Sequence, residues 1–183
     1  MRNLTYSALF TGIIAVLAQV AIPLPFSPVP VTGQLIGVLL AGAILGSRNG
    51  LLSVTAYILL GAAGAPVFSM ARGGIYMLAG PTGGYLWGFL PAVFLVGLAV
   101  ERKQGVSYLR IILIMAAALA LIYLFGGIQL GVIMRYTPVQ VLLTGVLPFL
   151  PFDLFKVFLA ALMYGKIAAS LKKSGLGEIP LSR

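Results

Sequence analysis

Asp153 and Lys156 are the two residues whose types and spacing most directly suggest chemistry. They lie three residues apart in the segment Pro151-Phe-Asp-Leu-Phe-Lys156, at the start of an apolar stretch. On an α-helix this spacing brings both side chains to one face, close enough to pair. A charge inside a membrane segment costs about 2.5–3.5 kcal/mol on the insertion scale, so it normally faces an interior. The pair is either a salt bridge that only neutralises itself or the polar floor of a ligand site. In such a site Asp153 would accept N–H donors, and Lys156 would keep it ionised or meet a carboxylate.

The glycine-rich stretch Ala71–Phe89 is the second place where chemistry is expected. Gly83 and Gly84 allow backbone conformations that are closed to other residues, and Pro81 fixes φ and removes a donor. The stretch therefore predicts an irregular loop that re-enters a helix near Tyr85. Irregular backbone at membrane depth is tolerated where it is packed in protein or lines a polar cavity. The loop is a first candidate for contacting a ligand; the alternative is a plain extracellular connection built from turn residues.

Other polar side chains are expected at the same outer level. Arg72 presents a planar fork that suits a carboxylate, unless it is simply a solvated loop residue. Gln34 offers both a donor and an acceptor, although it could equally serve as a cap or an interhelical hydrogen bond. The remaining candidates for the pocket are Thr32 beside Gln34 and three tyrosines with apolar rings and polar tips, Tyr57, Tyr76 and Tyr85. Trp87 is expected to be an interfacial anchor. Together these groups predict an outward-facing pocket for a small, mostly apolar solute with one carboxylate and one neutral hydrogen-bonding head.

Composition limits the classes of protein to which this chain can belong. Of its 183 residues 61% are hydrophobic and 8% are charged, whereas about 25% are charged in soluble domains. With no cysteine, no histidine and only Glu101, Asp153 and Glu178 as carboxylates, the chain lacks the usual nucleophile, general base and metal ligands. It also has no phosphate-binding P-loop. An intramembrane enzyme is therefore disfavoured, and no cofactor is expected.

The elements that must position these residues are predicted to be six transmembrane helices in one all-α membrane domain, residues 1–183. The segment Ile22–Pro30 contains four prolines, so it is interpreted as a stiff connection. Helices of about 15 residues span about 22 Å, which is less than the hydrocarbon core of about 30 Å. The connections on one side are thus expected to fold back and cap a cavity. The predicted helices are 4–22, 31–45, 51–61, 85–100, 109–133 and 148–169, with a substrate loop over 62–84.

The basic residues predict the orientation. If the N-terminus lies inside, the outer segments carry only Arg72 and Arg135, and the inner ones carry nine cations. The positive-inside rule then places the N- and C-termini in the cytoplasm, and the charge of +9 requires no nucleic acid. The inner cations are Arg2, Arg48, Arg102, Lys103, Arg110, Lys166, Lys172, Lys173 and Arg183.

Several segments together resemble one known family. The most specific segment runs from Arg72-Gly-Gly through Gly80-Pro-Thr-Gly-Gly-Tyr-Leu-Trp-Gly-Phe89. It is supported by Pro28-Val-Pro-Val-Thr-Gly-Gln34, Leu60-Gly-Ala-Ala-Gly-Ala-Pro-Val-Phe68 and Pro151-Phe-Asp-Leu-Phe-Lys156. Over nearly its whole length the chain resembles the BioY family, the biotin-specific substrate-binding (S) components of energy-coupling factor (ECF) transporters. It departs from the family pattern at Phe152, where a small residue is expected, and at Gly33, where a larger one is expected.

The resemblance implies an S-component fold that holds biotin near the extracellular face, in the cell membrane of a prokaryote. It implies partnership with a transmembrane T component and two ATPase subunits, with inward delivery by tilting of the whole subunit. On this resemblance Asp153 and Gln34 are expected to bind the ureido N–H groups. Arg72 is expected to face the carboxylate, with Lys156 as a second candidate, and Tyr85 and the Gly83-Gly84 backbone are expected to line the site. An S component for another vitamin and a facilitator that works alone are the alternatives.

Ala8 and Gly12 indicate where a partner helix could dock. Their spacing of four on the first helix would allow another helix to approach closely. The resemblance favours docking of the T component there, and packing within the bundle is the alternative. Gly33, Gly37 and Ala41 repeat the pattern on the second helix, where packing within the bundle is the preferred interpretation.

Overall fold

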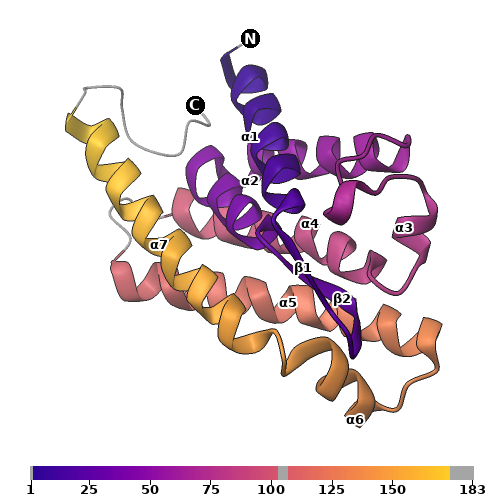
Figure 1. The fold of residues 1–183 in the computed structure, drawn as a ribbon. Coiled ribbons are helices and arrows are strands. Elements are labelled where there is room, and N and C mark those ends of the chain that lie inside the picture. The colour runs from indigo at the N-terminus through magenta and orange to yellow at the C-terminus, as the bar shows by residue number, and fades with distance from the viewer. Residues whose placement is uncertain (1, 103–106, 174–183) are drawn as a thin grey trace.

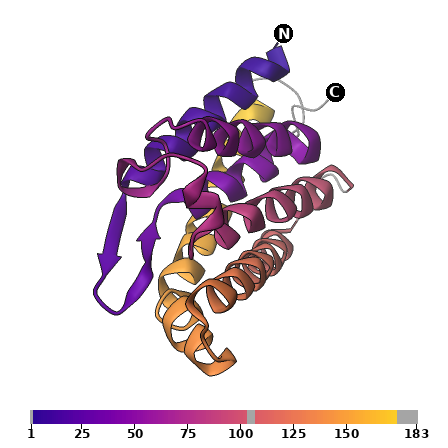
Figure 2. The same ribbon diagram turned by 90° about the vertical axis from the view of Figure 1, so that its right-hand side faces the viewer.

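The chain folds into long helices around one core (Figures 1 and 2). The computed structural model describes residues 2–102 and 107–173; Lys103, Glu178 and Arg183, which entered the sequence predictions, lie outside them. The long helices are α1 (Arg2–Gln19), α2 (Gln34–Ala62), α4 (Gly83–Glu101), α5 (Tyr108–Met134) and α7 (Leu150–Lys173). The shorter helical pieces are a 3-10 turn (Ser69–Ala71), α3 (Tyr76–Ala79), α6 (Pro138–Val141) and a π-helical segment (Leu142–Val146).

α2 is a helical hairpin broken at Gly46. This glycine has φ +81° and ψ −177°, a conformation that residues with a side chain rarely adopt. The chain reverses there: a Cβ placed on Gly50 would lie 3.1 Å from the carbonyl oxygen of Ala41. The Gln34 amide likewise donates to the hydroxyl of Tyr57, 23 residues further on. The helices predicted at 31–45 and 51–61 are therefore the two halves of α2. Residues 46–50, which lie between the two predicted helices, are helical except for Gly46, so the predicted gap is longer than the turn itself.

The proline-rich segment after α1 is a β-hairpin rather than an unpaired connection, and this corrects the prediction. β1 (Ala21–Leu24) pairs antiparallel with β2 (Ser27–Thr32), and Ala21 lies opposite Thr32. Each strand has a single neighbour, so prolines can occupy the unpaired edge without removing a ladder hydrogen bond. The pairing also ends α1 at Gln19 and delays the start of α2 to Gln34. The first helix is thus shorter than predicted at its end, and the second is shorter at its start.

Within the described residues α2, α4 and α5 are long and apolar enough to cross a membrane, although α2 reaches that length only when its two halves around Gly46 are counted together. A fourth candidate combines α6 and the π-helical segment with α7 across a 51° bend, and the apolar part of α1, Asn3–Gln19, is slightly shorter. Because α2 folds back on itself, the described residues form six long helical segments. In both views the start of α1 and the end of α7 lie at the same end of the molecule (Figures 1 and 2). The cytoplasmic location of that end stays a prediction.

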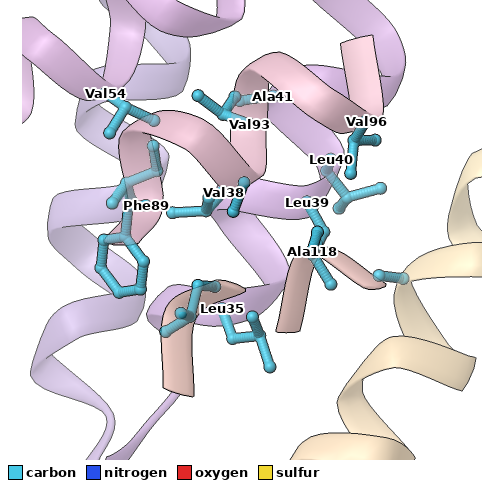
Figure 3. Packing of buried hydrophobic residues seen from close by; sticks show 14 of the residues in the cluster. Leu35, Val38, Leu39, Leu40, Ala41, Val54, Phe89, Val93, Val96 and Ala118 are labelled. Carbon is cyan, nitrogen blue, oxygen red and sulfur yellow. The ribbon is translucent and has the colours of Figure 1, made fainter. Parts of the chain in front are cut away.

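The core lies where α2 crosses α4 and α4 runs beside α5. Val38, Ala41, Val93 and Val96 are fully buried there (Figure 3). Close approach depends on Gly42 and Gly97, because a Cβ on Gly42 would lie 2.6 Å from the carbonyl oxygen of Val93. Interfaces between membrane helices favour such small residues.

Glu101 holds the turn of α2 against the end of α4. Its two carboxylate oxygens accept hydrogen bonds from the backbone N–H and the hydroxyl of Ser47, at 2.8 and 2.7 Å. Ser47 follows Gly46, so the carboxylate satisfies a donor at the start of the second half of α2, where a negative charge is stabilising. This carboxylate therefore has a structural role.

Candidate ligand-binding site

A pocket opens between the β-hairpin, the loop before α4, and helices α4, α5 and α7. It contains about 690 Å³ of empty space, which includes the solvent at its mouth. Its lining combines a few polar groups with apolar and aromatic walls. The lining residues are Val29, Pro30, Val31, Thr32, Gln34, Leu35, Phe68, Ser69, Met77, Thr82, Tyr85, Leu86, Phe89, Leu119, Ile122, Tyr123, Phe149, Asp153 and Lys156.

The carboxylate of Asp153 is the centre of one polar wall. Lys156 Nζ donates to Oδ1 at 2.7 Å, and the Tyr123 hydroxyl donates to Oδ2 at 2.8 Å. The side chains of Lys156 and Asp153 are 13% and 15% exposed, so the ion pair is largely removed from solvent. Each carboxylate oxygen can accept about two hydrogen bonds. One of these positions on each oxygen is occupied by Lys156 or Tyr123. The wall can therefore accept two further N–H donors from a ligand.

Gln34 is the centre of a second polar wall, at the start of α2. Its amide oxygen accepts a hydrogen bond from the Thr32 hydroxyl at 3.1 Å, and its amide nitrogen donates to the Tyr57 hydroxyl. The Tyr57 hydroxyl in turn donates to the carbonyl oxygen of Val67 at 3.1 Å. Tyr57 is buried behind Gln34 and does not line the pocket. These bonds leave one donor and one acceptor position on Gln34 for a ligand.

Aromatic rings form the remaining walls. Phe68 packs edge-on against Tyr57, with ring centroids 5.5 Å apart, and only a glycine fits beneath its ring, at Gly61. Tyr85 donates from its hydroxyl to the carbonyl oxygen of Gly145 at 2.8 Å, which ties α4 to the π-helical segment. These hydrogen bonds and close contacts restrain both rings, and together with Phe89 they offer an apolar surface to a ligand.

The loop residues predicted to contact a ligand occupy different environments. Arg72 and Tyr76 are exposed and do not line the pocket. The backbone N–H of Phe68 donates to the carbonyl oxygen of Arg72 at 2.9 Å. The backbone of Arg72 is therefore bonded to a residue that lines the pocket.

Gly83 and Gly84 are buried but do not line the pocket. A Cβ on Gly83 would lie 1.9 Å from the carbonyl oxygen of Leu78, and one on Gly84 would lie 2.3 Å from that of Phe125. The two glycines thus allow the loop and α5 to approach α4. Gln129 holds the same loop by donating to the carbonyl oxygens of Leu78 and Gly80.

Trp87, expected to be an anchor, is 41% exposed. Its indole N–H donates to the carbonyl oxygen of Leu78 at 3.4 Å.

The structure thus brings five of the predicted residues together at one pocket and adds residues that the sequence did not indicate. The five are Thr32, Gln34, Tyr85, Asp153 and Lys156. Among the added residues Tyr123 has the most direct polar contact. Its signal in the sequence is weak, because it is one tyrosine within a long apolar helix. Asp153, which accepts its hydrogen bond, lies on a different helix, 30 residues away.

Ala8 and Gly12 lie on an exposed face of α1. A Cβ on Gly12 would have no atom within 4 Å, whereas one on Gly37 would lie 3.0 Å from Ile14 and one on Gly33 would lie 2.8 Å from the carbonyl oxygen of Leu17. The small residues of α2 therefore serve packing within the bundle. Gly12, by contrast, packs against no other helix within the described part of the chain.

Comparisons with known proteins point to one family. The model of the BioY family matches residues 1–173. A curated relative from Thermotoga maritima, named biotin transporter BioY, is 41% identical over 94% of this chain and 97% of its own length. One of the same name from Rhizobium etli is 36% identical over 88% and 90%. A solved structure, described as the S-component for biotin from an ECF-type ABC transporter, superposes with a TM-score of 0.83 at 30% identity and covers 91% of this chain and 90% of that one.

Proposed function

Because this chain belongs to the BioY family, we propose that it is a biotin-binding S component that captures biotin at the outer face of a prokaryotic cell membrane. The observation that carries the proposal is the pocket itself, in which a paired carboxylate and an amide face aromatic walls. Several helices long and apolar enough to span a membrane surround it. The family consists of transporter components rather than enzymes, and no cofactor is proposed.

Biotin fits the chemistry of this pocket. Its ureido ring has two N–H donors and one carbonyl acceptor, which match the free positions on Asp153 and Gln34. Its thiophane ring is apolar and suits contact with Phe68, Tyr85 and Phe89. The ureido head therefore binds between α7 and the start of α2.

The binding test is calorimetric titration of the purified protein in detergent with biotin, without partner subunits. One-to-one binding that thiamine and riboflavin do not compete supports the proposal. A folded protein that binds another vitamin, or no vitamin, contradicts it. Uptake of biotin into vesicles that contain this protein without an ATPase would instead support a facilitator that works alone.

The carboxylate of biotin is proposed to meet Arg72. Lys156 is held 2.7 Å from Asp153, which the ureido head occupies, and the four-methylene chain of biotin carries its carboxylate away from that head. Arg72 follows the pocket-lining segment Phe68-Ser69, and its planar guanidinium suits a carboxylate.

Arg72→Ala is therefore expected to reduce the preference for biotin over its neutral methyl ester by about tenfold, since one charged hydrogen bond is lost. Lys156→Met is expected to weaken both ligands alike. The measurement is the ratio of the two Kd values for each variant. If Lys156→Met alone abolishes the preference, then Lys156 rather than Arg72 binds the carboxylate.

The partner surface is proposed to be the exposed face of α1 around Ala8 and Gly12. A transmembrane T component with two ATPase subunits would dock there and drive delivery, because this chain has no P-loop. Small side chains let the partner helix approach closely.

Ala8→Trp is expected to abolish co-purification with the T component and leave the Kd for biotin unchanged. Leu113→Trp, at a site 60% exposed on α5, is the matched control and should retain the partner. Loss of biotin binding in Ala8→Trp would show instead that this face supports the bundle.

A further inference from the structure

Tyr123 differs from Tyr57 and Tyr85 because its hydroxyl donates to a charged side chain of the site rather than to the backbone. Its hydroxyl donates to Asp153 Oδ2 across the interface of α5 and α7, at 2.8 Å. The hydroxyls of Tyr57 and Tyr85, by contrast, donate to the backbone carbonyl oxygens of Val67 and Gly145. Tyr123 also lines the pocket.

We infer that Tyr123 is a positioning residue that fixes the carboxylate plane of Asp153 for ligand recognition. The inference rests on the proposed role of Asp153 in binding the ureido group. A carboxylate held only by Lys156 can rotate about the bond to its Cβ, because an ammonium group is a point charge with rotatable donors. A second hydrogen bond, from another helix to the other oxygen, removes that freedom. The remaining acceptor positions then point in fixed directions.

The packing of Tyr123 makes it suited to this task. Its ring contacts both hydrophobic clusters, the main core and the small cluster of Val29, Leu130 and Phe149. Contacts on both sides restrict the ring to one orientation, so the hydroxyl is placed by the fold before a ligand arrives. Preorganisation of this kind improves affinity because less ordering is left to the binding step.

A double-mutant cycle tests the inference. Tyr123→Phe removes one oxygen atom and keeps the ring. It is expected to raise the Kd for biotin about tenfold, because one hydrogen bond to a charged group is lost. In the Asp153→Asn background the same change is expected to alter Kd less than about twofold, since residues that act through one another are not additive. Tyr164→Phe, on α7 outside the pocket, is the control and should bind as the parent does.

A second ligand separates positioning from a structural role. Biotin methylated at both ureido nitrogens cannot donate to Asp153, so Tyr123→Phe and the parent should bind it equally. A loss of affinity for both ligands, or equal losses in the parent and Asp153→Asn backgrounds, would overturn the inference. If Asp153→Asn weakens binding and Tyr123→Phe does not, the inference fails while the proposed function stands. If Asp153→Asn binds biotin as the parent does, the inference and the proposed role of Asp153 both fail, whereas the proposed biotin binding stands.

Discussion

Asp153→Asn is expected to weaken biotin binding by about 30- to 1,000-fold, the largest loss of any single change in the pocket. The substitution keeps the shape of the side chain but removes the charge and turns one acceptor into a donor. Lys156, now 2.7 Å from a neutral group, would remain as an unpaired cation in a largely buried position. Truncating one partner of such a pair costs about 2–5 kcal/mol of binding free energy, and the lower part of that range corresponds to the expected change in Kd.

The measurement is calorimetric titration of both proteins, with thermal unfolding as a check that the variant is folded. Glu101→Gln provides the matched control, since this carboxylate is bonded to Ser47, outside the pocket. It should leave the Kd for biotin unchanged. A folded Asp153→Asn protein with the Kd of the parent would show that the ligand does not use this carboxylate.

Gly97→Ala is expected to have the largest effect on stability, lowering Tm by about 5–10 °C. A Cβ at this position would lie 2.3 Å from the backbone nitrogen of Ser47 and 2.5 Å from the carbonyl carbon of Gly46. Backbone atoms cannot turn aside as a flexible side chain can, so α4 must move away from the turn of α2. Overpacking of this kind costs about 1–3 kcal/mol or more, and each kcal/mol shifts Tm by about 2–4 °C in a chain of this size.

Gly165→Ala on α7 is the control, because a Cβ there has no atom within 4 Å. Its Tm should be unchanged or slightly higher, since alanine favours a helix over glycine. Thermal unfolding in the same detergent compares the three proteins. Equal Tm values for Gly97→Ala and the parent would mean that the two helices do not cross as closely as described.

Local sequence patterns were sufficient for the features that depend on neighbouring residues. The spacing of Asp153 and Lys156 predicts an ion pair on one helix face, and the structure shows it at 2.7 Å. The apolar runs predict membrane helices because the bilayer sets a minimum length. The predicted helices 31–45 and 51–61 also bracket the place where the chain reverses, although Gly46 alone makes the turn within the five residues left between them.

Contacts between distant segments could not be predicted in the same way. Four prolines exclude a helix over 22–30, but only the pairing of Ala21 with Thr32 makes the segment a hairpin. Gly83 and Gly84 look like ligand-contacting loop glycines, yet the structure uses them to bring Leu78 and Phe125 close to α4. Glycine serves both purposes, and its neighbours in sequence do not reveal which of the two applies.

The sequence by itself determined the class of this protein, its helical membrane architecture and its family, together with the charged pair on which the site is built. These follow from composition, from the apolar runs and from motifs along the chain. Only the tertiary structure decided which polar groups share a pocket. Tyr123 meets Asp153 in the pocket across 30 residues, whereas Tyr57, which is bonded to Gln34 across 23 residues, lies behind the pocket wall. The physical reason is that such contacts depend on how whole helices cross, and a crossing is fixed by the packing of all helices together.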